Sequence, residues 1–141
     1  LSSVVSDYEN NNKSIKFVNK LHSTDLYMNI DSSQISRVFQ NIIINSIHSI
    51  NENHTNNGEI IYSSYETEDD IIISFKDNGI GLKYEKEDLI KPYFTTKKKA
   101  GGSGLGLAIV EKILFDHHAD FSMVNRNDKN KGAEVIITFS K

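Results

Sequence analysis

The residues best suited to binding chemistry form the pentapeptide Asp77-Asn78-Gly79-Ile80-Gly81. It follows an apolar run at 71–75, whose length and β-branched content predict a buried strand. An ionised Asp77 accepts hydrogen bonds but cannot donate them, so its natural partner is an amine such as the N6 group of adenine. The two glycines allow bare main chain to lie against a flat ligand. The alternative, for these five residues alone, is an acidic hairpin turn.

A second group of polar residues has helical spacing. Asn41 and Asn45 are four residues apart, so their amides share one face of a helix, and His48 continues the same stripe. An amide oxygen can bind Mg²⁺ without adding charge, which suits a cation already shared with phosphate oxygens. The alternative is an ordinary solvated helix face.

A glycine-rich stretch at 101–107 runs directly into a predicted helix. Unpaired N–H groups at a helix N-terminus, together with the helix dipole, form an anion site, and triphosphate is the anion that we expect. The Gly-x-Gly-x-Gly spacing after a lysine-rich segment is not a dinucleotide fingerprint, and the Gly-Lys-Ser/Thr ending of a P-loop is missing. Taken alone, the stretch is better explained as a flexible hinge.

Hydrophobic periodicity predicts the elements that position these residues. We expect helices over residues 1–8, about 32–50 and about 105–117, with a helical turn within 83–90. The expected strands cover residues 14–18, 25–30, 59–66, 70–76, 119–125 and 133–139. Residues 95–103 have no hydrophobic anchor and are expected to form a mobile loop. The order predicts a two-layer α/β (α+β) sandwich, with a mostly antiparallel sheet covered on one face by helices.

Bulk composition narrows the classes of function. The chain of 141 residues is long enough for one domain with a sizeable core. A net charge of −3 gives no reason to expect nucleic acid or an anionic membrane as the main partner. The absence of cysteine excludes a disulfide scaffold and a thiolate metal site. No apolar stretch approaches the roughly 20 residues of a spanning helix. Because the chain opens at Leu1 rather than Met, we expect a piece of a longer protein.

Four stretches, in this order, resemble the ATP-binding catalytic domain of sensor histidine kinases, within the gyrase/Hsp90/histidine kinase/MutL ATPase superfamily. Residues 41–46 resemble its asparagine box, 77–81 its first glycine box, 93–97 its phenylalanine box and 102–110 its second glycine box. The sequence Lys-Pro-Tyr-Phe-Thr-Thr-Lys at 91–97 looks most like the nitrogen-regulation and dicarboxylate-sensor branch. The resemblance covers essentially the whole chain and implies a Bergerat-type ATP-binding fold with a mixed sheet.

The resemblance also implies a role for each matched residue. Asp77 would accept the adenine amine, and Gly79 and Gly81 would pass close to the base. Asn45, and with less support Asn41, would hold Mg²⁺ on the phosphates. A lid over residues 90–103 would close on the nucleotide. The other implied nucleotide contacts are His48, Phe94, Lys97, Gly102, Gly104, Leu105 and Gly106.

Three departures from the family pattern affect the expected chemistry. Hydrolases of the superfamily carry a glutamate at the position of Asn41, and an amide cannot act as a base, so we expect slow hydrolysis and catalysis by positioning alone. His48 stands where many kinases have a lysine, and its binding to phosphate would be weaker or dependent on pH; a surface histidine is an equal alternative. Ala133 replaces a threonine that supports adenine, so we expect an ordered water at Asp77.

The expected partners follow from the resemblance. None of His22, His54, His117 and His118 has the sequence context of a phosphoacceptor, so the γ-phosphoryl would pass to a histidine of a separate dimerisation module, and then to a response regulator. Residues 1–12 would be the end of the connection from that module. The domain would be cytoplasmic, alone or within a membrane-anchored sensor. The alternatives are an anti-sigma-type serine kinase, another ATPase of the superfamily, and a nucleotide-sensing or protein-docking module that does not catalyse.

Overall fold

The computed structural model describes residues 1–11, 14–21, 31–53, 57–82, 106–126 and 131–141. Its helices are α1 (Ser2–Asn11), α2 (Ser32–Glu52) and α4 (Gly106–Asp116). Its strands are β1 (Ile15–Lys20), β2 (Gly58–Glu66), β3 (Asp70–Asp77), β4 (Asp120–Asn125) and β5 (Ala133–Ser140). The expectations for the strand at 25–30, the helical turn at 83–90 and the loop at 95–103 fall outside the described residues.

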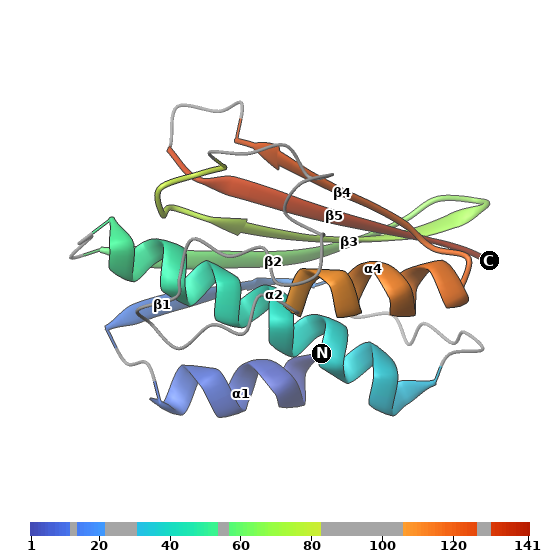
Figure 1. The fold of residues 1–141 in the computed structure, drawn as a ribbon, viewed down its shortest axis with the longest axis horizontal. Helices are drawn as coiled ribbons and strands as arrows, with labels where there is room; N and C mark the ends of the chain where they lie inside the picture. The colour runs from blue at the N-terminus through green and yellow to red at the C-terminus, as the bar shows by residue number, and fades with distance from the viewer. Residues whose placement is uncertain (12–13, 22–30, 54–56, 83–105, 127–130) are drawn as a thin grey trace.

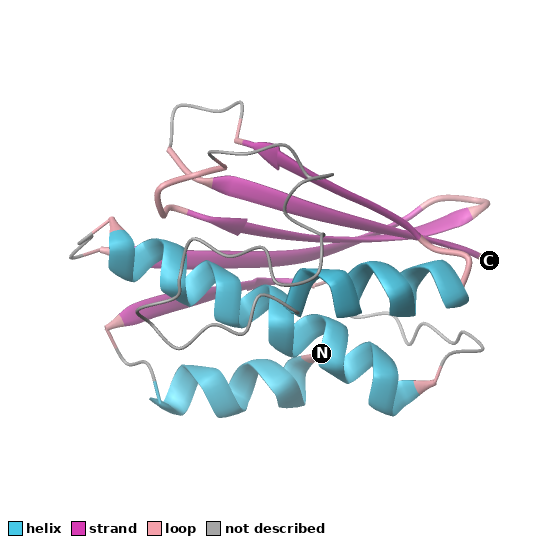
Figure 2. Ribbon diagram, viewed as in Figure 1, coloured by secondary structure: helices cyan, strands magenta, loops and turns pink. Residues whose placement is uncertain are grey.

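The five strands form one mixed sheet in the order β1-β2-β3-β5-β4. β1 pairs in parallel with β2, and the other neighbouring strands pair antiparallel. The parallel pair requires a crossover connection, which runs through α2. Figures 1 and 2 show the three helices together on one face of this sheet. The predicted two-layer sandwich with a mostly antiparallel sheet is therefore confirmed.

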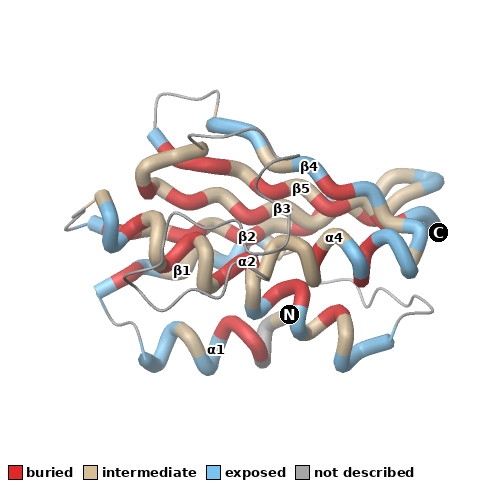
Figure 3. The backbone as a smooth tube through the Cα atoms, in the orientation of Figure 1, coloured by how far each residue is buried: buried red, intermediate tan, exposed pale blue. Residues whose placement is uncertain are grey.

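The long helix α2 covers the sheet with an apolar face. It begins where the Asp31 carboxylate accepts hydrogen bonds from the N–H groups of Ser33 and Gln34, which have no partner within the helix. Every apolar residue expected on the docking face is buried, namely Ile35, Val38, Phe39, Ile42, Ile43, Ile47 and Ile50. In Figure 3 the buried parts of α2 and of the strands face each other across the core. The rings of Phe39 and Phe75, with centroids 5.9 Å apart, join helix to sheet.

Two predicted element ends are wrong. α1 continues through Glu9 to Asn11, although these polar residues were expected to form a loop. The Asn11 amide donates to the Asp7 carbonyl oxygen at 3.0 Å and so satisfies a carbonyl of the last turn. β1 extends to Lys20 because its ladder with β2 continues to the pair Lys20–Ser63. Pairing across the sheet, rather than hydrophobicity, sets the end of this strand.

The imidazole of His117 ties α4 to the start of α2. Its Nε2 accepts a hydrogen bond from the Asp31 N–H at 3.1 Å, so its Nδ1 carries the proton and donates to the Ile113 carbonyl oxygen at 2.8 Å. At the other end of α4, Gly106 lies against the Asn41 side chain of α2. The two helices are therefore in contact near both ends of α4. Figure 1 shows that they run antiparallel.

We predict that His117→Ala lowers the free energy of unfolding by about 1–2 kcal/mol, because it removes both of these hydrogen bonds. Denaturant unfolding followed by circular dichroism measures the change. His118→Ala is the control, because it removes the imidazole of the exposed neighbouring histidine. The backbone of His118 has a positive φ of 55°. Equal losses in the two variants would contradict a specific tie through His117.

Candidate nucleotide site

Asp77 is a buried carboxylate at the end of a central strand. It is the last residue of β3 and only 5% exposed. Its Oδ1 accepts hydrogen bonds from the Gly79 N–H at 2.9 Å and the Ala133 N–H at 3.3 Å. The Ser46 hydroxyl of α2 hydrogen-bonds to the same carboxylate. The predicted strand-to-turn change at Asp77 is confirmed, and the acid lies inside the domain rather than on a surface hairpin.

Burial raises the pKa of Asp77 above the ordinary aspartate value, because desolvation disfavours the charged form. The hydrogen bonds from Gly79, Ala133 and Ser46 act against this rise, and so does the positive charge of Arg126. A buried carboxylate lowers the stability of the fold unless hydrogen bonds and opposite charges compensate for its lost hydration. Such a perturbed acid is characteristic of a functional site.

Both glycines of the pentapeptide lie where a side chain would not fit. A Cβ at Gly79 would collide with Ser49 of α2, whose Oγ accepts a hydrogen bond from the Ile80 N–H at 3.0 Å. Gly81 has φ +79°, and a Cβ there would lie 2.7 Å from Oδ1 of Asn125. The loop is thus pressed against α2 on one side and the end of β4 on the other. Contact of these glycines with a base stays a prediction.

Asn78 anchors the loop to β2 through its side-chain amide. Its Oδ1 accepts a hydrogen bond from the Glu59 N–H at 2.8 Å, and its Nδ2 donates to the Asn57 carbonyl oxygen at 2.7 Å. The amide therefore pairs with main chain as another strand would. Sequence reasoning treated Asn78 only as a turn residue.

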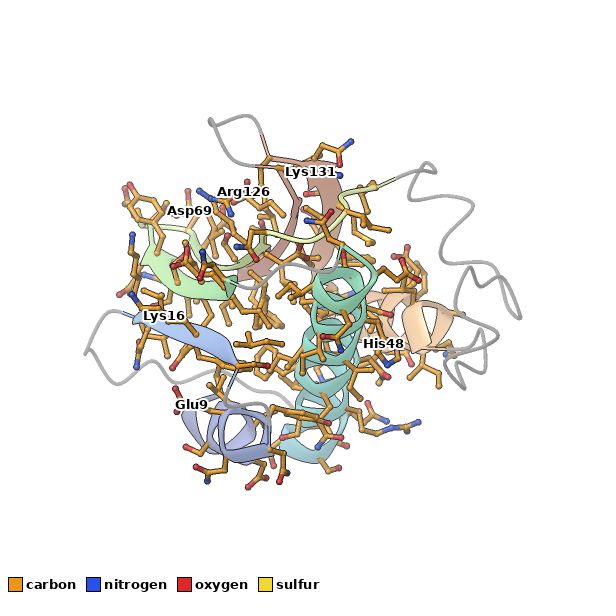
Figure 4. The ribbon with its side chains drawn as sticks, turned by 90° about the vertical axis from the view of Figure 1, so that its left-hand side faces the viewer. Glu9, Lys16, His48, Asp69, Arg126 and Lys131 are labelled. Atoms are coloured by element: carbon orange, nitrogen blue, oxygen red, sulfur yellow. The ribbon has the colours of Figure 1, made fainter. Side chains whose placement is uncertain are left out.

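The polar stripe of α2 connects the Asp77 loop to the N-terminus of α4. Ser46, which follows Asn45 directly, reaches Asp77. One turn earlier, the Asn41 side chain lies at the first residue of α4, where Oδ1 would be 3.3 Å from a Cβ on Gly106. Figure 4 shows His48 on the side of α2 that faces α4. The structure therefore gathers the asparagine box and the first glycine box at one place.

Several predicted contacts cannot be placed. Phe94, Lys97, Gly102, Gly104 and Leu105 fall outside the described residues, as does the lid expected over 90–103. Gly106 is described and opens α4, as its motif predicts. Within the described ranges, no group of three or more His, Asp or Glu side chains could hold a metal ion. Binding of Mg²⁺ by Asn41 and Asn45 stays a prediction.

The position of Ala133 shows what sequence reasoning missed. Although Ala133 has no hydroxyl, its main-chain N–H donates to the Asp77 carboxylate at 3.3 Å, a contact that sequence reasoning did not predict. Arg126 was also missed, and its Nη1 donates to the Asp77 carbonyl oxygen at 3.1 Å. Ser46 is the last residue of the asparagine motif at 41–46 and could have been found from that motif. The ordered water expected at Asp77 stays a prediction.

Comparison with known proteins identifies the family. The family described as histidine kinase-, DNA gyrase B-, and HSP90-like ATPase matches residues 30–141. The chain belongs to this ATPase family. Membership confirms the resemblance found in the four motifs and supports ATP as the ligand of the domain.

Curated relatives of the chain include sensor histidine kinases. Sensor histidine kinase WalK of Bacillus subtilis (strain 168) is 33% identical over 133 residues, which cover 89% of this chain and 20% of WalK. Nitrogen regulation protein NtrY of Azorhizobium caulinodans is 34% identical over 112 residues, which cover 77% of this chain and 14% of NtrY. The chain thus spans a fifth or less of the length of these two relatives.

Solved structures with the same fold are histidine kinase domains. The nucleotide-free catalytic domain of histidine kinase ThkA superposes with a TM-score of 0.84 at 28% identity, over 99% of this chain and 89% of that domain. ThkA in complex with the response regulator protein TrrA gives a TM-score of 0.72 at 26% identity, over 100% of this chain and 40% of that one. The agreement confirms the fold expected for this ATPase family. None of the helices described here is long and apolar enough to cross a membrane.

We predict that Asp77→Asn folds, and that its stability relative to the wild type rises with pH. An amide can keep its oxygen toward Gly79 and Ala133 and donate to the Ser46 hydroxyl. Because folding raises the pKa of Asp77, this carboxyl's contribution to stability is present below the unfolded pKa and falls as pH rises through the folded one. Denaturant unfolding at stepped pH should therefore favour the variant increasingly across this window, with a plateau above it.

The control for this pH series is Asp120→Asn, which removes a charge from the exposed side of β4. A difference between Asp77→Asn and wild type that stays constant across the pH range would contradict a raised pKa at Asp77.

Proposed function

We propose that this domain binds Mg·ATP between α2, the Asp77 loop and the N-terminus of α4, and presents the γ-phosphoryl to a histidine of a separate dimerisation module. The chain would be the catalytic part of a sensor histidine kinase. The observation that carries the proposal is the buried Asp77 carboxylate, hydrogen-bonded from the helix that also bears Asn41 and Asn45. That combination supports a site in which an acceptor for adenine lies beside oxygen donors for a phosphate-bound cation.

Each group in the site has a distinct task. Asp77 accepts the adenine amine, which selects an amine-bearing base over one that presents a carbonyl there. Asn45, with Asn41, would hold Mg²⁺, and the bound cation would supply charge neutralisation at the phosphates. The N-terminus of α4 at Gly106 points its free N–H groups and its dipole at the phosphates. His48 would contact the phosphates from the same stripe.

Transfer to a protein is favoured over hydrolysis by the chemistry of Asn41. Hydrolysis needs a base that activates water, and an amide has no useful basicity. The site therefore positions and neutralises the triphosphate while another module supplies the nucleophile. His117 does not supply it, since its partly buried ring is hydrogen-bonded through both nitrogens within the fold.

The relatives support the wider proposal. WalK is a sensor histidine kinase, and histidine kinase ThkA is seen in complex with a response regulator protein. We propose that this chain is likewise a segment of a longer, cytoplasmic or membrane-anchored kinase, with residues 1–12 ending the connection from its phosphoacceptor module. Its product phosphohistidine would pass the phosphoryl group to a response regulator.

We predict that substitutions at the adenine-binding and magnesium-binding parts of the site change nucleotide affinity in different ways. Asp77→Asn should weaken ATP by about 1–3 kcal/mol, or ten- to a hundredfold, because an amide N–H would face the adenine amine. Asn45→Ala should abolish the effect of Mg²⁺ on ATP affinity while leaving adenosine binding unchanged. Calorimetric titration with adenosine and with ATP, each with and without Mg²⁺, separates the two. Unchanged ATP affinity in Asp77→Asn, or a normal response to Mg²⁺ in Asn45→Ala, would remove that residue from the site.

We predict that the full-length protein forms acid-labile, base-stable phosphohistidine from labelled ATP, and that Asp77→Asn in that protein lowers the yield. The 141-residue chain alone should bind ATP and phosphorylate nothing. Acid-stable phosphoserine on a partner would instead indicate the anti-sigma-type kinase. ATP binding without any transfer in the full-length protein would indicate a nucleotide-sensing module.

A further inference from the structure

The end of β4 reaches across to the segment Asp77–Leu82 through a side-chain amide. Oδ1 of Asn125 accepts a hydrogen bond from the Leu82 N–H at 2.6 Å, and its Nδ2 donates to the Leu82 carbonyl oxygen at 3.4 Å. One carboxamide thus pairs with both main-chain polar groups of a residue 43 positions away in the chain. β4 is an edge strand, and Asn125 forms its last pair with β5. The Asn125 side chain adds a contact to Leu82, which belongs to neither strand.

The next residue holds the opposite end of the same segment. Nη1 of Arg126 donates to the Asp77 carbonyl oxygen at 3.1 Å. The Arg126 main chain is itself fixed, since its N–H donates to the Gly132 carbonyl oxygen at 2.9 Å. In Figure 4, Arg126 and Lys131 project at the same end of the molecule, where β4 stops and β5 begins. Consecutive side chains therefore reach the first and the last residue of the Asp77–Leu82 segment.

The packing leaves little freedom between these two anchors. A Cβ at Gly132 would collide with the Asp77 carbonyl oxygen, and a Cβ at Gly81 would lie 2.7 Å from Oδ1 of Asn125. Two glycines with positive φ thus allow the hairpin and the loop to touch main chain to main chain. The loop position depends directly on where β4 ends.

We propose that Asn125 and Arg126 are positioning residues that fix the Asp77–Leu82 segment from both ends and thereby set the domain's affinity for adenine nucleotides. This inference rests on the proposed nucleotide site. The physical reason is conformational entropy. A loop that is anchored in the folded domain loses this entropy during folding, whereas a released loop would lose it on nucleotide binding and so weaken the affinity. Neither residue belongs to the four motifs that indicated the site.

The surroundings of the Asp77 carboxylate give Arg126 a second, separable effect. α2 contributes the Ser46 hydroxyl, β5 the Ala133 N–H and the loop itself the Gly79 N–H. Among the described residues, Arg126 provides the opposing charge. The guanidinium lowers the pKa of the carboxyl, so its loss would raise the pH at which Asp77 takes up a proton and stops accepting from adenine.

The first test compares two asparagine-to-alanine substitutions in the 141-residue chain, each of which removes a side-chain amide that accepts a hydrogen bond from a main-chain N–H. Asn125→Ala should weaken ADP and Mg·ATP by the same factor, about tenfold, with the response to Mg²⁺ retained. Asn19→Ala is the matched control, because Asn19 also accepts from a main-chain N–H, that of Leu21 at 2.9 Å, just beyond the opposite edge strand β1. Calorimetry gives the affinities, and denaturant unfolding gives the stability of each variant. Equal affinities in the two variants would overturn the role of Asn125.

The second test is the pH profile of ADP binding, which loss of stability alone does not move. Arg126→Gln should shift the acid midpoint of binding to higher pH, Arg126→Lys should restore it toward the wild type, and Lys131→Gln should leave it unchanged. Lys131 is the control because its Nζ contacts Asn53 at 3.4 Å rather than Asp77. An unshifted midpoint in Arg126→Gln would overturn the effect of Arg126 on the Asp77 carboxyl, and an unchanged ADP affinity at neutral pH would overturn its positioning role.

The outcomes separate this inference from the function on which it rests. A wild-type chain that binds no adenine nucleotide would overturn both. Normal wild-type binding with no loss in Asn125→Ala and no shift in Arg126→Gln would overturn the positioning role alone. Should Asn125→Ala fail to fold, the Arg126 series decides, since Arg126→Lys keeps the charge.

Discussion

The candidate site depends on keeping one carboxylate inside an apolar core. Asp77 ends a central strand, and burial there disfavours its charged form. Main-chain N–H groups from its own loop and from β5, together with a hydroxyl from α2, stabilise the charge. Each donor comes from a different part of the fold, so the helix, the loop and the last hairpin must all be in place around the acid. The site is in this sense a product of tertiary structure.

Much of the fold follows from local pattern in the sequence. The apolar stripe of α2 and the β-branched run before Asp77 each specify an element and the face that it buries. Element ends were less predictable, because they depend on pairing and capping rather than hydrophobicity. Asn11 and Lys20, both polar, extend their elements through a side-chain hydrogen bond and a sheet ladder.

Some residues of the candidate site could likewise be predicted from the sequence, and others could not. Asp77, Asn41 and Asn45 could be predicted, because residue type and helical spacing carry their chemistry within a short stretch. Arg126 and Asn125 could not, since their partners lie more than 40 residues away. Only the strand order, which sets β5 between β3 and β4, brings that hairpin to the loop. Ala133, one of the three departures from the family pattern, still donates to Asp77 from its main-chain N–H, which does not depend on side-chain identity.

One helix spans the whole site, and this limits how the site can evolve. The residues of α2 from Asn41 to Ser49 reach α4 at one end and the Asp77 loop at the other, over a helical rise of about 12 Å. Inserting or deleting one residue between them would rotate one end by about 100° relative to the other. The length of the segment from Asn41 to Ser49 therefore fixes the separation between the contact of α2 with α4 and its contact with the Asp77 loop.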